Sequence, residues 1–137
     1  MKKNPQHPKH IESQLQQRAV AQFRSTWPEY DRLFFSVPNG GKRGKVEAAI
    51  MKGEGLVKGV ADTLLLVPNE KYHGLCIEFK KIEYTYENGR EHYKKGSQSK
   101  DQKIWQELVE KQGYKYAIAY DIEGFWEIIN DYLGKRY

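Results

Sequence analysis

The sequence lacks the features of a disulfide-bonded, zinc-binding or membrane-spanning protein. Cys76 is its single cysteine, which excludes an internal disulfide and a cysteine-based zinc cluster. No apolar run approaches the roughly 18 residues of a membrane-spanning helix. Residues 1–8 are basic but no apolar stretch follows them, so they do not resemble a signal peptide. We therefore expect a reduced, soluble, cytoplasmic protein that does not engage a membrane.

The chain is long enough for one domain and too short for two, at 137 residues. It is polar, but ten tyrosines, five phenylalanines and three tryptophans supply large side chains for a core and argue against disorder. We expect a flexible tail over residues 1–8 and one folded domain over residues 9–137. The net charge of +5 is a mild excess that is also common in proteins without a polyanionic partner.

Apolar periodicity and turn chemistry predict eight elements in the order α-β-α-β-β-α-β-α. Helices are predicted where apolar residues recur at helical spacing, over residues 9–26, 45–52, 99 or 101 to 112, and 122–133. Strands are predicted in β-rich runs between turn residues, over residues 33–37, 60–67, 75–80 and 114–120. This order predicts a single α/β domain with a mixed central sheet flanked by helices.

The strands predicted at 60–67 and 75–80 form a hairpin that brings charged residues together. Its turn is centred close to residue 70, which sets Asp62 opposite Glu78 in an antiparallel pair. A slip of one residue would make the two carboxylates diagonal neighbours and exchange faces. Lys80 lies two residues beyond Glu78 and projects from the same face. Three charged groups thus gather at one end of an otherwise apolar hairpin.

The cluster can be interpreted as a metal-binding catalytic site or as an ordinary exposed strand end. Adjacent carboxylates repel one another, and oxygen ligands favour Mg²⁺ or Mn²⁺ over zinc. A lysine beside such a metal can activate a water or stabilise charge on a phosphate, which suits hydrolysis of a phosphodiester. A Glu-x-Lys tripeptide alone is more often an exposed strand end. The coincidence of Asp62, Glu78 and Lys80 favours a site.

These residues also carry a resemblance to a known family. Residues 59–62 (Gly-Val-Ala-Asp) and 77–80 (Ile-Glu-Phe-Lys) resemble the Asp…Glu-x-Lys signature of the PD-(D/E)XK nuclease superfamily. Three further stretches resemble the VRR-NUC (virus-type replication-repair nuclease) family, in the right order within residues 9–133. They are residues 37–41, residues 58–62, and residues 99–102 followed by Trp105, Gly113 and Tyr114. The resemblance implies a restriction-endonuclease-like fold.

The resemblance implies roles for individual residues. Asp62 and Glu78 would bind Mg²⁺ or Mn²⁺ together with the backbone carbonyl of Phe79, and Lys80 would act on the attacking water or the transition-state charge. Glu12 matches an acidic residue on the family's first helix, and Gln102 matches a glutamine near its active site; solvated helix residues are the simpler interpretation of both. The residues expected to contact DNA are Asn39, Lys42, Arg43, Lys58, Lys81 and Lys100.

The polar stretch at residues 82–98 departs from the family's minimal connection. It is expected to be a long excursion or an extended hairpin tip, serving as a DNA-contacting tip, a dimer arm or a mobile loop. Tyr84, Tyr86 and Tyr93 could stack on bases or pair with one another across strands.

The resulting hypothesis is a metal-dependent, structure-specific DNA endonuclease that acts as a homodimer on Holliday junctions or related branched DNA. It would serve replication, recombination or repair, in the host cytoplasm if the source is a phage. One alternative is a catalytically silent DNA-binding or assembly module. Another keeps the nuclease but changes its substrate to flaps, nicks or RNA.

Overall fold

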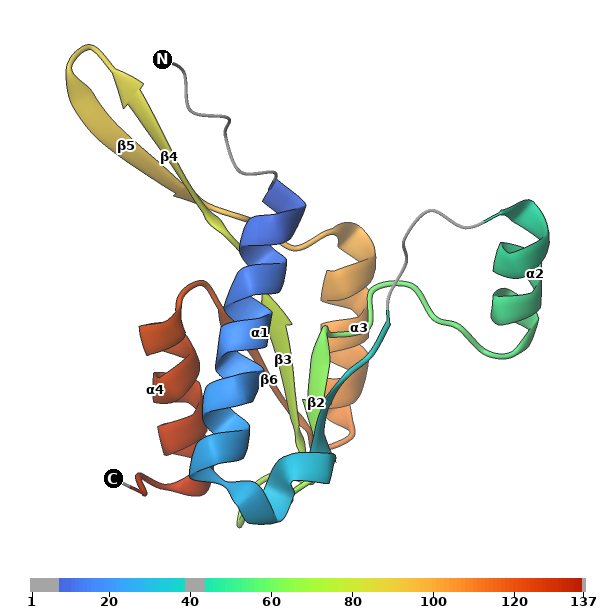
Figure 1. Ribbon diagram of the computed structural model, residues 1–137. Helices are drawn as coiled ribbons and strands as arrows, with labels where there is room; N and C mark the ends of the chain where they lie inside the picture. The colour runs from blue at the N-terminus through green and yellow to red at the C-terminus, as the bar shows by residue number, and fades with distance from the viewer. Residues whose placement is uncertain (1–7, 39–43, 137) are drawn as a thin grey trace.

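The computed structural model describes residues 8–38 and 44–136 of the chain. These residues form a four-stranded sheet with helices on both faces, and a separate two-stranded hairpin (Figure 1). The elements in chain order are α1 (Pro8–Thr26), the 3-10 helix η1 (Pro28–Leu33), β1 (Phe34–Ser36), α2 (Lys45–Gly53), β2 (Thr63–Leu65), β3 (Leu75–Phe79), β4 (Ile82–Glu87), β5 (Arg90–Lys95), α3 (Lys100–Lys111), β6 (Lys115–Ala119) and α4 (Ile122–Leu133).

The four-stranded sheet is mixed, with the strand order β1-β2-β3-β6. β1, β2 and β3 are antiparallel neighbours, whereas β6 runs parallel to β3. Parallel neighbours need a crossover connection, and α3 lies in the one between β3 and β6. α1 and α4 cover one face of the sheet and α3 covers the other (Figure 1). The predicted α/β domain, with a mixed sheet flanked by helices, is confirmed.

The order of elements differs from the predicted order in two places. The first is η1, which begins at Pro28, where the fixed φ of proline suits a first helical position. The second is the polar stretch, where β4 and β5 show that the extended hairpin is the correct alternative. The strand predicted at residues 60–67 is shorter than expected, because β2 contains only Thr63–Leu65.

Two stretches that the sequence singles out, the N-terminal tail and residues 37–41, are only partly described by the structure. Residues 1–7 and 39–43 lie outside the described residues. Pro8, which the prediction placed in the tail, is the first residue of α1.

Capping and helix-ending residues set the boundaries of three helices. α1 ends at Thr26, directly before the Trp27-Pro28 pair that disfavours further helix. The Ser99 side chain caps α3 by accepting a hydrogen bond from Gln102 N–H, and the Asp121 side chain caps α4 by accepting one from Gly124 N–H. No described helix has the length and apolar character needed to span a bilayer.

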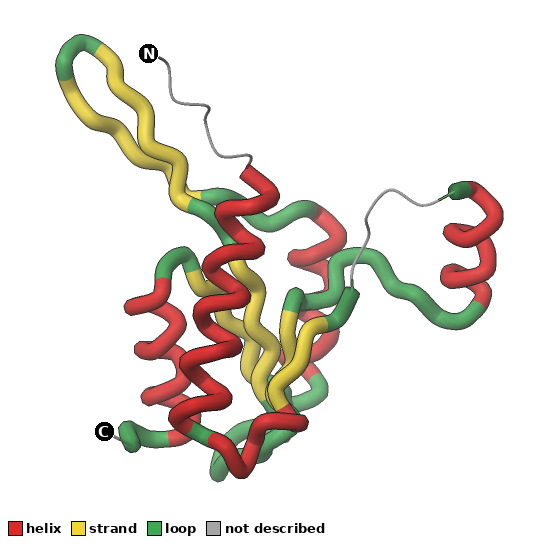
Figure 2. Tube along the Cα trace, in the orientation of Figure 1, coloured by secondary structure: helices red, strands yellow, loops and turns green. Residues whose placement is uncertain are grey.

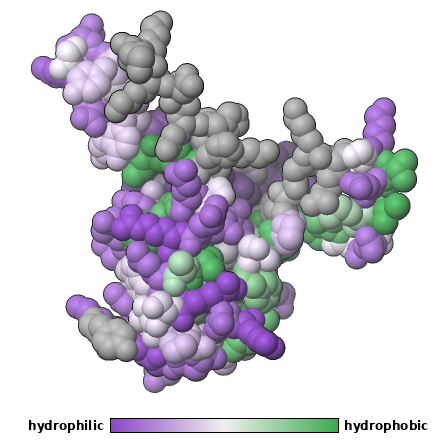
Figure 3. Space-filling view, viewed as in Figure 1, coloured by the Kyte–Doolittle hydropathy of each residue, from purple (hydrophilic) through white to green (hydrophobic). Residues whose placement is uncertain are grey.

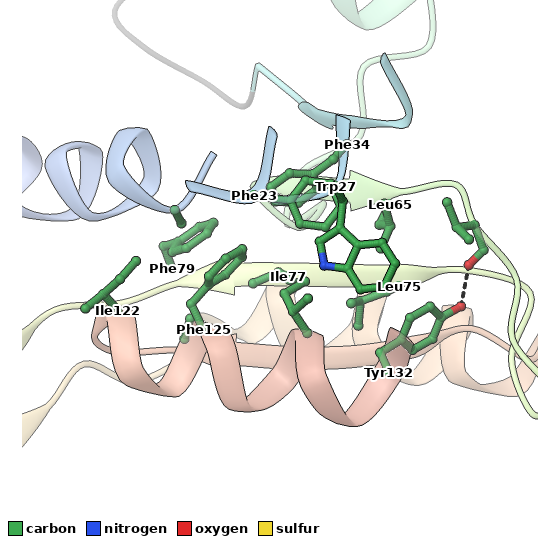
Figure 4. Packing of buried hydrophobic residues seen from close by; sticks show 14 residues of the cluster. Phe23, Trp27, Phe34, Leu65, Leu75, Ile77, Phe79, Ile122, Phe125 and Tyr132 are labelled. Atoms are coloured by element: carbon green, nitrogen blue, oxygen red, sulfur yellow. Dashed lines mark hydrogen bonds between the residues drawn. The ribbon is translucent and has the colours of Figure 1, made fainter. Parts of the chain in front are cut away.

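The larger core lies between the sheet and the pair α1 and α4 (Figure 4). Fully buried aromatic rings connect the layers, with centroids 4.7 Å apart for Phe23 and Phe34 and 6.0 Å apart for Phe34 and Phe125. Tyr132 is buried at the edge of this core, where its hydroxyl donates a 2.7 Å hydrogen bond to the Val67 carbonyl. This packing fixes β3, which is buried along its whole length.

Candidate active site at the carboxyl end of β3

The pairing of β2 with β3 sets the register of the candidate site. Thr63 pairs with Ile77 and Leu64 pairs with Cys76. Continuing this register by one residue sets Asp62 opposite Glu78, as predicted from the turn. The amide of Val37 donates a 2.8 Å hydrogen bond to the Asp62 carbonyl, so β1 also supports the backbone at this point.

Asp62 and Glu78 bring two carboxylates together at the end of the sheet. One Asp62 oxygen, Oδ2, accepts a 2.7 Å hydrogen bond from the amide of Phe79, which orients the carboxylate toward β3. Glu78 is only 2% exposed. Burial raises the pKa of Glu78 well above its ordinary value, and the adjacent Asp62 raises it further, while Tyr116 and Lys80 act in the opposite direction. Ionising both carboxyl groups of the pair therefore costs free energy.

A chain of hydrogen bonds holds the Glu78 carboxyl group from the α3 side. The Tyr116 hydroxyl donates to Glu78 Oε2 at 3.1 Å and accepts from Gln98 Nε2 at 3.2 Å. Gln98 also donates to Gln106 Oε1 at 2.8 Å. Burial and the Glu78 charge raise the pKa of Tyr116, so its hydroxyl remains a donor at neutral pH.

Tyr116 is a site residue that the sequence patterns did not indicate. Tyr116 pairs with Cys76 in the parallel ladder between β6 and β3, two residues before Glu78. Alternation along the strand predicted at residues 114–120 could indicate which of its side chains share a face. The sequence did not show that this strand lies beside β3, so it did not connect Tyr116 with Glu78.

Lys80 follows β3 directly, and its backbone is held by β6. Its amide donates a 3.0 Å hydrogen bond to the Ala119 carbonyl. Gly96 lies against the Lys80 side chain, because a Cβ atom placed on Gly96 would lie 3.5 Å from Lys80 Cβ. The positive charge of Lys80 lowers the pKa of Glu78, which places the amine within electrostatic range of the carboxylate pair. The three residues expected in the cluster therefore lie together.

Glu12 approaches this cluster from α1 but contacts a different residue. Glu12 Oε2 accepts a hydrogen bond from the amide of Lys81 at 3.3 Å. Within residues 8–38 and 44–136, no three or more His, Cys, Asp or Glu side chains form a group that could hold a metal ion. Glu12 thus lies beside the end of β3 without completing a three-carboxylate cluster with Asp62 and Glu78.

The Gln102 side chain takes part in capping the N-terminus of α3. Its Oε1 accepts a 2.8 Å hydrogen bond from the Ser99 amide, and Ser99 Oγ accepts a 3.2 Å hydrogen bond from the Gln102 amide. The backbone at Gly59 packs on this end of α3, where a Cβ atom would collide with the Asp101 carbonyl group. Gly59 also has φ of +84°, a conformation that favours glycine. Gln102 therefore lies near the segment that leads to Asp62.

Three of the six residues expected to contact DNA can be placed. Lys58 is exposed and precedes Gly59, and Lys100 is the exposed first residue of α3, so both lie at the same end of this helix. Lys81 is half-buried, and its Nζ lies 2.7 Å from Glu83 Oε1. Asn39, Lys42 and Arg43 lie outside the described residues.

The fold and the site define an α/β domain that carries a carboxylate pair, with Glu78 buried and Asp62 half-buried, and a lysine at one end of a mixed sheet. A solved structure described as a "VRR_NUC domain protein" has the same fold, with a TM-score of 0.69. The alignment covers 89% of this chain and 87% of that one, at 23% sequence identity. It confirms the VRR-NUC-like fold that the sequence resemblance implied, and at this identity it shows the fold alone. No family model and no curated protein matches the sequence.

Proposed function

We propose that the protein is a metal-dependent nuclease with a PD-(D/E)XK active site formed by Asp62, Glu78 and Lys80. The observation that carries the proposal is the buried carboxylate of Glu78 beside Asp62, with Lys80 directly after the same strand. Two adjacent carboxylates, of which Glu78 is buried and Asp62 is half-buried, gain from a divalent cation because it offsets their repulsion. The solved VRR_NUC domain protein, whose fold this chain shares, gives the proposal its class of activity.

The donor set suits Mg²⁺ or Mn²⁺. Asp62 and Glu78 would supply the carboxylate oxygens, and the backbone carbonyl of Phe79 would supply a third ligand. Mg²⁺ is commonly bound through one or two carboxylates, with waters and substrate phosphate as its other ligands, so a third protein carboxylate is not required. Such an ion, when bound, would lower the pKa of a coordinated water and offset charge on the scissile phosphate.

We assign separate roles to the other side chains near the carboxylate pair. Lys80 carries a positive charge at the end of β3, where it stabilises negative charge that develops on the phosphate in the transition state. Glu12, whose carboxylate accepts a hydrogen bond from the Lys81 amide, would orient a water near the same strand end. Gln102 keeps the start of α3 against the segment that precedes Asp62, and Lys58 and Lys100 present positive charge beside it.

Branched DNA is the substrate class that we propose for this nuclease. A single domain of this size has little surface for reading a base sequence, so recognition of DNA structure is the simpler mode. A homodimer with two-fold symmetry would present two active sites to two strands, which symmetric cleavage of a Holliday junction requires. Such an enzyme would act in replication, recombination or repair.

A cleavage assay on a panel of labelled substrates tests this proposal. The panel contains a four-way junction, a flap, a linear duplex and single-stranded DNA, each with Mg²⁺, Mn²⁺ or EDTA. We expect cleavage of branched DNA in either metal, no cleavage in EDTA, and at least a hundredfold loss in Asp62→Asn, because one ligand charge is removed. Undiminished cleavage by Asp62→Asn, or binding of branched DNA without cleavage in any metal, would contradict the proposal.

A further inference from the structure

The hairpin formed by β4 and β5 is separate from the main sheet. It forms its own two-stranded sheet, and every residue of both strands is exposed except Ile82, which is half-buried. Figures 1 and 2 show it extending away from the body of the molecule. An isolated two-stranded hairpin is marginally stable in water, so a ribbon of this kind gains from a binding partner.

The strand register divides the hairpin into two unlike faces. Tyr84 pairs with Tyr93 and Tyr86 pairs with Glu91, so one face carries three tyrosines. These rings are exposed, at 63% for Tyr84, 75% for Tyr86 and 69% for Tyr93. We call this surface the tyrosine face. In Figure 3 the hairpin, at upper left, shows pale side chains of intermediate hydropathy beside strongly hydrophilic ones.

The opposite face carries paired charges. Glu83 pairs with Lys94, and Glu87 pairs with Arg90, across the strands. Over the whole hairpin the basic residues are balanced by acidic ones: Arg90, Lys94 and Lys95 against Glu83, Glu87 and Glu91. A surface that binds the phosphate backbone needs a surplus of positive charge, which this ribbon lacks. Aromatic rings, in contrast, bind the flat faces of bases, and these are accessible in unpaired nucleotides.

The hairpin is attached directly to the candidate active site. β3 ends at Phe79, Lys80 and Lys81 follow, and β4 begins at Ile82. The Gly96 amide closes the base of the hairpin by donating a 2.9 Å hydrogen bond to the Lys81 carbonyl. Six residues of extended strand span roughly 20 Å, so the tyrosines extend from the side of Lys80 over a length of several nucleotides.

We propose that the tyrosine face binds unpaired bases of the DNA substrate by stacking, beside the phosphate that is cleaved. The inference rests on the proposed nuclease function and narrows its substrate to DNA with an unpaired segment next to the cleavage position. Stacking tolerates any base, so this contact selects DNA structure rather than sequence. A continuous duplex does not offer base faces and gains nothing from the tyrosines.

The test compares two double variants, one on each face of the hairpin, at neighbouring cross-strand residue pairs. Tyr84→Ala/Tyr93→Ala removes one cross-strand ring pair, and Thr85→Ala/His92→Ala truncates the next pair on the opposite face. Binding is measured by fluorescence anisotropy in EDTA, with a forked duplex bearing unpaired arms and with a fully paired duplex. We expect the tyrosine variant to lose roughly 10- to 100-fold in affinity for the forked duplex only, because each ring contributes about tenfold by stacking. The control variant should bind like the wild type.

Two further measurements distinguish base stacking from phosphate binding and from contact with a second protein. Tyr84→Phe/Tyr93→Phe keeps the rings and should keep the affinity, and the salt dependence of the tyrosine variant should match the wild type because no phosphate contact is removed. Equal losses on both duplexes, or no loss on either, would overturn the inference. Unchanged DNA affinity with a changed sedimentation coefficient would also overturn it, because the rings would then cover a second protein.

Failure of the proposed nuclease function gives a different result. Hydrolysis of the small phosphodiester bis(p-nitrophenyl) phosphate with Mn²⁺ needs the metal site but has no bases to stack. We expect the tyrosine variant to keep this activity at the wild-type rate. If the wild type lacks it and also cleaves no DNA, the nuclease proposal fails, whereas the anisotropy result still decides whether the hairpin binds unpaired bases.

Discussion

Lys80→Ala is expected to lower the rate of DNA cleavage by about a hundredfold or more while metal binding is retained. Loss of a charge that stabilises the transition state typically costs a few kcal/mol of activation free energy. The charge of Lys80 is the weakest of the influences on the pKa of Glu78, which burial and Asp62 dominate. We therefore expect the affinity for the metal to change little. The measurement is single-turnover cleavage at saturating enzyme and metal, which isolates the chemical step from DNA binding.

A lysine at the other end of the β2–β3 hairpin provides the control for this variant. Lys71 is exposed in the turn between the two strands, so Lys71→Ala removes the same charge far from the carboxylate pair. We expect the cleavage rate of Lys71→Ala to stay within about twofold of the wild type, since an exposed charge at this distance is screened by salt. Equal losses in both variants, or full activity in Lys80→Ala, would remove Lys80 from the reaction.

Glu78→Gln is expected to abolish cleavage and, at the same time, to stabilise the metal-free protein. The substitution replaces a buried carboxyl group, whose ionisation is opposed by burial and by the adjacent Asp62, with a neutral amide. A glutamine of the same shape can donate a hydrogen bond to Asp62 and accept one from Tyr116. We expect the free energy of unfolding without metal at neutral pH to rise by about 1–3 kcal/mol. Thermal unfolding in EDTA measures this change.

The pH dependence of unfolding gives the same variant a second test. The pKa of Glu78 is raised in the folded protein, so the folded state binds more protons than the unfolded state once the pH exceeds the ordinary value of 4.5. This contribution to stability is complete below that pH and is lost as the pH rises through the folded-state pKa. The wild type should therefore lose stability over this range relative to Glu78→Gln. Glu70→Gln, at an exposed position in the loop between β2 and β3, should follow the wild type. A lower melting temperature for Glu78→Gln than for the wild type at neutral pH would show that the buried Glu78 carboxyl group does not destabilise the metal-free protein.

Part of the site follows from sequence because antiparallel pairing is local. The connection between β2 and β3 spans residues 66–74 and is centred on residue 70, so the Asp62–Glu78 pair follows from neighbouring sequence without knowledge of the rest of the fold. The position of Lys80 then follows from alternation along one strand. The caps at Ser99 and Asp121 are local for the same reason.

The contacts of Tyr116 could not be derived in this way. β6 lies beside β3 because the chain crosses over through α3, and the sequence does not specify which strands become parallel neighbours. The hydrogen bond from Tyr116 to Glu78 joins residues 38 positions apart. Its existence depends on that packing and on no local pattern.

The sequence at the tip of the β4–β5 hairpin indicates a tight turn, but it does not show that the flanking residues form strands. Asn88 and Gly89, which have φ of 52° and 73°, form the two-residue loop typical of a tight hairpin. The flanking strands lack the apolar alternation that marks a strand packed on a core, because both faces of the ribbon are exposed. An extended hairpin and an irregular excursion were therefore both consistent with the sequence.

Titration of the protein with Mn²⁺ determines whether Asp62 and Glu78 form a divalent-metal site. Calorimetry compares the wild type with Asp62→Asn, which keeps the size of the side chain and its hydrogen bond to the Phe79 amide but removes the charge. We expect saturable binding to the wild type and a loss of at least about tenfold in affinity for the variant, because one of two carboxylate ligands becomes neutral. Identical titration curves for the two proteins would show that Asp62 is not a metal ligand.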